Sequence, residues 1–275
     1  MTREIPAPNR PAVGLDEIKD AHGSAPWAHR LIENAQNYAD LICDLPGTES
    51  PAQWLPNSDD FVVILEGSYE CEIEEHGTHV LGEDSFLCIP KGHAVQYRVT
   101  SDEPAIRVTI RWPDAQALPA DRRTPAERRS AHSVMPTVPA TGRPGTPEHL
   151  VPNQAVLTLD DLKQTRGPAP WSHLLIANEG FMNNLIYLEP HPPPDGHWHA
   201  ICDEWWMIRE GQLRWDLEGI GVYTVKRGDF VCAPAGYLHK INVIGDVPAI
   251  RMPSVVPRVP HLGPEVTGYQ RRLPA

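Results

Sequence analysis

The sequence predicts an all-β protein made of two similar barrels or sandwiches in tandem. Short apolar or alternating runs such as EWWMIREG and VYTVKRGDF are separated by Gly, Pro and Asp, a pattern typical of antiparallel strands joined by turns. No long stretch shows a helical period. The second half of the chain also repeats the first at a constant offset, which indicates an internal duplication.

The duplication sets the expected domain boundaries. The segment GSAPWAHRLI at 23–32 returns as GPAPWSHLLI at 167–176, an offset of 144 residues, and FLCIPKG at 86–92 returns at the same offset as FVCAPAG at 230–236. We therefore expect three parts: an N-terminal barrel at 1–113, a linker at 114–156, and a C-terminal barrel at 157–275. The linker is expected to begin with a short helix and to continue as a Pro-rich segment.

The composition of the 275 residues, 41% hydrophobic and 22% charged, is that of a globular protein. A net charge of −12 argues against a nucleic-acid partner, because such proteins need a basic face for the phosphates. The N-terminus lacks a signal-peptide pattern and no apolar run is long enough to span a membrane, so we expect a cytoplasmic protein without a membrane partner. Five cysteines without a C-x-x-C pair are expected to be free thiols.

The residues that carry chemistry lie in the second repeat. His197 and His199 are two residues apart, so on a strand their imidazoles point to the same face. Glu204 follows after a short turn, and His239 arrives from a later strand beyond the turn PAG at 234–236. Three imidazoles and a carboxylate favour a divalent ion, Fe(II), Mn(II), Ni(II), Cu(II) or Zn(II), and leave one or two coordination positions open for substrate, water or O₂.

These residues resemble the two sequence motifs of the cupin family. The first motif, H-x-H, four residues, E, six residues, G, is met by His197, His199, Glu204 and Gly211. The second, G, five residues, P-x-G, two residues, H, ends at His239 and also contains Gly228, Pro234 and Gly236. The resemblance implies a bicupin, two jelly-roll barrels in one chain, with a metal held by His197, His199, Glu204 and His239.

The first repeat keeps the scaffold of these motifs without the ligands. The offset places Gln53, Leu55, Asp60 and Val95 at the four ligand positions, and neither Leu nor Val binds a metal. His76, His79 and His93 lie nearby in sequence but not at ligand positions. We expect the N-terminal barrel to have a structural or dimerising role, with a metal site in the C-terminal barrel alone. His29 and His173 of the shared Trp-x-His pair occur in both halves, so we expect them to be structural as well.

Four further side chains are candidates for contact with a substrate. Alternation from Glu204 places Trp206 on the inward face, where it could stack on a flat molecule. On the preceding strand either Asn184 or Tyr187 faces inward, and alternation alone does not decide between them. Arg251 could bind a carboxylate as a bidentate fork, although Arg107 occupies the same place in the first repeat and this favours a structural role. Cys232 matches Cys88 and is expected to pack in the core.

The function favoured by the sequence is that of an Fe(II) dioxygenase, an oxidoreductase acting on a small organic molecule. One alternative is a non-oxidative lyase, decarboxylase or isomerase in which the metal polarises a carbonyl or carboxylate. Another is a binding protein without catalysis. The expected partner is a small-molecule substrate, and a homodimer is compatible with the resemblance.

Overall fold

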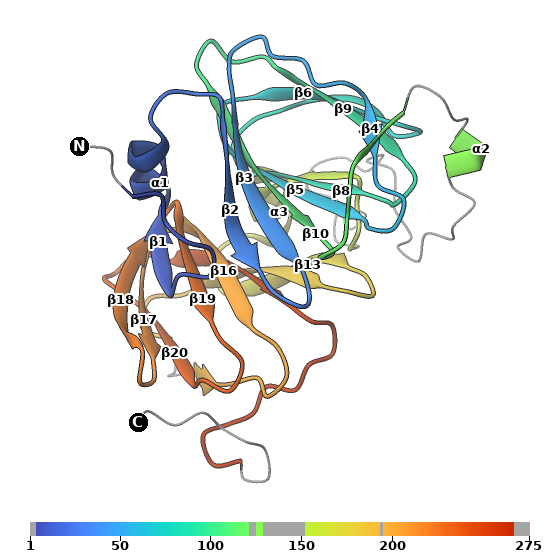
Figure 1. Ribbon diagram of the computed structural model, residues 1–275. Helices are drawn as coiled ribbons and strands as arrows, with labels where there is room; N and C mark the ends of the chain where they lie inside the picture. The colour runs from blue at the N-terminus through green and yellow to red at the C-terminus, as the bar shows by residue number, and fades with distance from the viewer. Residues whose placement is uncertain (1–3, 121–124, 129–151, 193–194, 267–275) are drawn as a thin grey trace. The chain divides into compact units, whose positions relative to one another are not determined.

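The computed structural model describes residues 4–120, 125–128, 152–192 and 195–266 (Figure 1). Strands dominate it, and the all-β fold class predicted from the sequence is confirmed. The chain divides into two compact units, one built around the N-terminal repeat and one around the C-terminal repeat.

The N-terminal unit consists of two antiparallel sheets. The six-stranded sheet has the order β12-β8-β5-β10-β3-β2, with β2 at Trp27–Glu33, β3 at Tyr38–Asp44, β5 at Asp60–Glu66, β8 at Ser85–Ile89, β10 at Ala105–Arg111 and β12 at Val156–Thr158. The five-stranded sheet has the order β11-β4-β9-β6-β7, with β4 at Gln53–Trp54, β6 at Tyr69–Ile73, β7 at Gly77–Leu81, β9 at Ala94–Val99 and β11 at Leu118–Pro119. Apolar side chains from both sheets form one core.

The C-terminal unit repeats this arrangement. Its six-stranded sheet has the order β1-β19-β16-β21-β14-β13, with β1 at Ala12–Gly14, β13 at Trp171–Ala177, β14 at Met182–Leu188, β16 at Glu204–Glu210, β19 at Asp229–Ala233 and β21 at Ala249–Val255. Its four-stranded sheet has the order β15-β20-β17-β18, with β15 at Asp195–His197, β17 at Gln212–Leu217, β18 at Gly221–Lys226 and β20 at His239–Val243. Both sheets again contribute to one core.

Each unit contains the strand that begins the other repeat. β1 pairs with β19, with Ala12 opposite Val231, and β12 pairs with β8 in the equivalent register, with Val156 opposite Leu87. The described residues up to Ala21 accordingly belong to the C-terminal unit, and the described residues from His22 to Gly167 belong to the N-terminal unit. The boundaries predicted at 113 and 157 follow the repeat and differ from these compact units, because strand pairing between distant segments leaves no mark in a repeat offset.

Two short helices lie at equivalent places in the two repeats. α1 spans Leu15–His22 and α3 spans Leu159–Arg166; the sequence analysis predicted neither. α3 begins with a capping box, in which the Asp161 amide donates to Thr158 Oγ1 and the Thr158 amide donates to the Asp161 carboxylate. The short helix expected in the linker appears as α2, Pro125–Arg128, while 121–124 and 129–151 lie outside the described residues. None of the described helices has the length and apolar composition of a membrane span.

The glycine that closes the first motif is required in both units by geometry. Gly211 and its counterpart Gly67 have φ angles of 70° and 73°, in the left-handed region that side chains rarely adopt. A Cβ on Gly211 would lie 2.8 Å from the Cβ of Ala249, and a Cβ on Gly67 would lie 2.8 Å from the Cβ of Ala105. The N-terminal unit lacks the ligand residues, but its Gly67 is still required by the positive φ angle and the close approach of Ala105.

All five cysteines are free and buried, as the sequence predicted. Burial raises the pKa of the Cys232 thiol to about 12 and that of Cys202 to about 11. These thiols are therefore protonated at neutral pH, and Cys232 packs in the core as expected.

Candidate metal centre

The four predicted ligand residues converge inside the C-terminal unit because the strand register brings them together. His197 ends β15 and lies directly opposite His239, the first residue of β20. His199 follows β15, and Glu204 begins β16 in the other sheet. All four residues are buried, with between 1% and 7% of their surface exposed.

The ligand atoms surround a single point. Nε2 of His199 lies 2.8 Å from Oε2 of Glu204, and Nε2 of His239 and of His197 lie 3.3 Å and 3.5 Å from the same oxygen. The Nε2 atoms of His197 and His239 are 3.1 Å apart. Two atoms bound at right angles to one ion at about 2.1 Å would lie about 3 Å apart, so this spacing matches that of ligands on one metal ion.

The proton positions point to the same conclusion. Nδ1 of His199 lies 2.9 Å from the carbonyl oxygen of Pro260, and because a carbonyl only accepts, this nitrogen carries the proton. In the neutral imidazole, Nε2 then directs its lone pair at the carboxylate of Glu204. A cation shared between the lone pairs and the carboxylate would satisfy both, which is the arrangement that a metal ion provides.

The electrostatics favour the protonation states that bind metals. Burial alone would raise the pKa of Glu204, but the three imidazoles of His197, His199 and His239 beside it hold that pKa well below its usual range. Burial lowers the pKa of His239, against the opposing effect of the Glu204 carboxylate. At neutral pH the site therefore combines a carboxylate with a neutral His239 imidazole.

In the described part of the chain, this is the one cluster of three or more His, Cys, Asp or Glu side chains that could hold a metal ion. His76 and His93 do approach each other in the N-terminal unit, with ring centroids 5.9 Å apart, and His93 lies 3.6 Å from the Glu75 carboxylate. They do not form a ligand cluster among the described residues.

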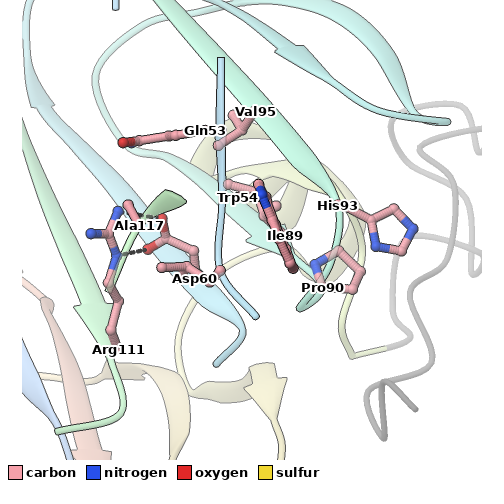
Figure 2. Close-up of a pocket in the computed structure, with 10 residues that line it drawn as sticks. Gln53, Trp54, Asp60, Ile89, Pro90, His93, Val95, Arg111 and Ala117 are labelled. Carbon is pink, nitrogen blue, oxygen red and sulfur yellow. Dashed lines mark hydrogen bonds and ion pairs between the residues drawn. The ribbon is translucent and has the colours of Figure 1, made fainter. Parts of the chain in front are cut away.

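At the equivalent place in the N-terminal unit an ion pair occupies the centre. Gln53 lies opposite Val95 in the register of His197 and His239. Arg111 forms a bidentate pair with Asp60, with N–O distances of 3.0 Å and 2.6 Å (Figure 2). These four residues and Leu55 line a cavity of about 10 Å³, enough for about one water molecule.

Strand register decides which predicted substrate contacts face the interior of the C-terminal unit. Arg251 lies opposite Ile186 on one side and Ile208 on the other, and paired residues share a face of the sheet. Ile208 and Trp206 belong to the core between the sheets. Arg251 and Asn184 are therefore on the same interior face as Trp206.

Trp206 and Tyr187 differ in their relation to the ligands. The fully buried Trp206 ring lies 5.0 Å from the His239 ring, measured between centroids. Tyr187 lies on the opposite face of β14 from Asn184, where its ring contacts Trp171 at 5.2 Å. The structure thus places Asn184 toward the interior and Tyr187 away from it, a choice that alternation alone did not allow.

The Trp-x-His histidines lie apart from the ligand cluster. His29 is buried in β2 and His173 is buried in β13. The His29 ring contacts His22 at the end of α1, and His22 stacks on Trp27 with centroids 4.9 Å apart. These contacts agree with the structural role expected of His29.

One histidine next to the ligands was missed by the sequence analysis. His261 follows β21, and the centroid of its ring lies 4.5 Å from that of His197 and 4.8 Å from that of His199. It belongs to neither motif and lies beyond the segment used for the repeat. Extending the 144-residue offset by a few residues would have paired it with Ala117.

One protein-family model matches part of the C-terminal unit. The family model described as the cupin domain matches residues 184–254, which contain all four ligand residues. A search of curated protein sequences finds no significant match.

Solved structures of similar fold cover most of the chain. A Cupin 2 conserved barrel domain protein from Leptotrichia buccalis is 12% identical with a TM-score of 0.62, over 89% of this chain and 95% of that one. Salicylate 1,2-dioxygenase from Pseudaminobacter salicylatoxidans is 12% identical with a TM-score of 0.60, over 83% and 76%. Bacillus subtilis oxalate decarboxylase, a protein with Mn(II) centres, is 15% identical with a TM-score of 0.50, over 89% and 72%. At these identities the similarity establishes the fold.

Proposed function

Since residues 184–254 match the cupin domain, we propose that this chain is a metal-dependent enzyme whose C-terminal unit binds one divalent transition-metal ion and acts on a small organic molecule. The observation that carries this proposal is the convergence of three imidazoles on the carboxylate of Glu204 in a buried site. Four protein ligands leave one or two positions of an octahedral ion for exogenous ligands, which distinguishes a catalytic site from a closed structural one.

The side chains around the ligands have separable roles. The Pro260 carbonyl fixes the ring and the tautomer of His199 by accepting from Nδ1. Trp206 covers the His239 ring and excludes water from that side. Asn184 and Arg251, on the same interior face, supply polar groups for a substrate, and a guanidinium suits a carboxylate. The metal, when bound, would act as a Lewis acid or support redox chemistry.

The reaction we favour is dioxygenation, with Fe(II) in the site. The ligand set allows substrate and O₂ to occupy adjacent positions, and the tryptophan-lined interior suits a small, partly apolar molecule. Salicylate 1,2-dioxygenase, among the proteins of similar fold, acts on a molecule of that kind.

Non-oxidative chemistry is the second candidate, and Arg251 is the observation that favours it. Arg251 is buried, with 6% of the residue surface exposed, and its Cζ lies 6.0 Å from the Trp215 ring centroid. A buried guanidinium would fit a lyase or decarboxylase acting on a small carboxylate, and oxalate decarboxylase is among the proteins of similar fold. The cytoplasmic location and the homodimer expected from the sequence stay predictions.

O₂ consumption by the metal-loaded protein separates the two candidates. Protein loaded with Fe(II) or Mn(II) would be mixed with a panel of hydroxybenzoates and short dicarboxylates, and O₂ uptake and CO₂ release would be recorded. Dioxygenation predicts stoichiometric O₂ uptake with Fe(II), lost in His197→Ala and retained in the exposed control His191→Ala. CO₂ release without O₂ consumption would favour the lyase, and turnover that survives His197→Ala would contradict both.

A further inference from the structure

The segment that follows β21 is tied to the first motif. The backbones of Trp198 and Leu262 exchange two hydrogen bonds of 3.0 Å, and Trp198 Nε1 donates to the Gly263 carbonyl at 3.1 Å. Val259 is buried against Cys202. Together with the bond from His199 to Pro260, these contacts hold residues 259–263, here named the C-terminal strap, beside the metal ligands.

The strap carries an imidazole to the solvent side of the cluster. The His261 ring contacts the rings of His197 and His199 at 4.5 Å and 4.8 Å between centroids. The separation of those two ligand rings from each other is 5.2 Å. His261 is exposed, whereas His197 and His199 are buried. His261 therefore connects the buried cluster with the protein surface.

The N-terminal unit shows independently that this position faces the site. Its segment 115–119 is tied down in the same way: Leu118 pairs with Trp54, and Trp54 Nε1 donates to the Pro119 carbonyl at 3.3 Å. Ala117, the counterpart of His261, lines the cavity formed by Arg111 and the four ligand-equivalent residues (Figure 2). The architecture therefore directs this residue of the strap toward the centre in both units.

His261 nonetheless lies outside the set of four converging ligand atoms. A side chain that lies beside the ligands without belonging to their set can reach a molecule bound to the metal, and a neutral imidazole carries one N–H donor. We propose that His261 is a substrate-positioning residue, which donates a hydrogen bond to an anionic ligand at the open coordination position. This inference rests on the proposed metal site and adds to it the residue that selects an anionic oxygen or nitrogen ligand.

The test uses azide binding to Co(II)-loaded protein, followed by the visible absorption of Co(II). His261→Ala should leave Co(II) affinity within about twofold of wild type and weaken azide binding about tenfold, the loss of one hydrogen bond to a charged partner. His261→Asn, which keeps a donor, should recover most of the azide affinity. His191→Ala, a change at a histidine whose side chain is 72% exposed, should alter neither value.

Two results would overturn the inference. Unchanged azide affinity in His261→Ala would show that the imidazole does not contact the bound anion. A loss of Co(II) affinity of tenfold or more would show that His261 is a metal ligand instead. If the wild-type protein did not bind Co(II), the proposed function itself would be contradicted. This outcome is seen without any variant and is therefore distinguishable from the other two.

Discussion

The two units place different groups next to an equivalent buried carboxylate. Each has a buried carboxylate at the start of the equivalent strand, Glu204 in β16 and Asp60 in β5. In the N-terminal unit the cation comes from the chain itself, as Arg111 at the end of β10. In the C-terminal unit the counterpart of Arg111 is Val255, and three imidazoles face the carboxylate instead.

This difference indicates that the barrel centre is a site for a cation in both units. A buried carboxylate is costly unless it is paired, and the guanidinium of Arg111 fills in one unit the role that a metal would fill in the other. Burial would lower the pKa of Arg111, but Asp60 raises it above its usual value. The Asp60 carboxylate of the N-terminal unit is thus paired without a metal, and the C-terminal unit has side chains that could hold one.

Replacing a ligand by its counterpart residue should have the largest effect. His239→Val, which copies Val95, removes one of four donors, and the metal dissociation constant should rise by more than the roughly 10–100-fold typical of changes outside the ligand set. Isothermal titration with Zn(II) and Co(II) measures this. Val95→Ala is the matched control, and a similar loss of affinity in that variant would contradict the distinction between the units.

Grafting the ligand set should give the N-terminal unit a metal site. The variant carries Gln53→His, Leu55→His, Asp60→Glu, Val95→His and Arg111→Val, which reproduces the C-terminal centre on an equivalent backbone. We expect metal content, measured by inductively coupled plasma mass spectrometry, to increase by about one ion per chain. The same variant without Gln53→His, Leu55→His and Val95→His should not gain this ion.

Breaking the internal ion pair should destabilise the N-terminal unit. Arg111→Val leaves the Asp60 carboxylate buried and unpaired, with its side chain 3% exposed, and we expect the free energy of unfolding to fall by about 3–5 kcal/mol. Urea denaturation measures the change. Adding Asp60→Asn to Arg111→Val should recover part of the loss, and equal stability of wild type and Arg111→Val would show that the pair does not balance a buried charge.

Reducing the size of the Trp206 ring should have the smallest effect on metal and substrate binding. Trp206→Phe keeps a ring beside His239 but reduces its area, and an aromatic contact of this kind is worth about 0.5–1.5 kcal/mol. Metal affinity should change little, while KM for an aromatic substrate should rise a few-fold. An equal change in KM for an aliphatic substrate would indicate loss of packing rather than loss of ring contact.

The sequence predicted which four side chains converge, because the motifs and the repeat offset fix positions along the chain. It missed features set by pairing between distant segments. The strand exchange of β1 and β12, the bond between Asp60 and Arg111, and the position of His261 all depend on partners far apart in sequence. Asn184 and Tyr187 could not be separated by alternation alone, since that choice required the register with β21.

The central claim is that one unit of this chain binds a metal and the other carries its own cation. Metal stoichiometry of the purified chain, measured after saturation with Fe(II) or Co(II) and removal of excess ion, tests it most directly. We predict one ion per chain, and none in His239→Val. Two ions per chain, or one ion retained in His239→Val, would contradict the claim.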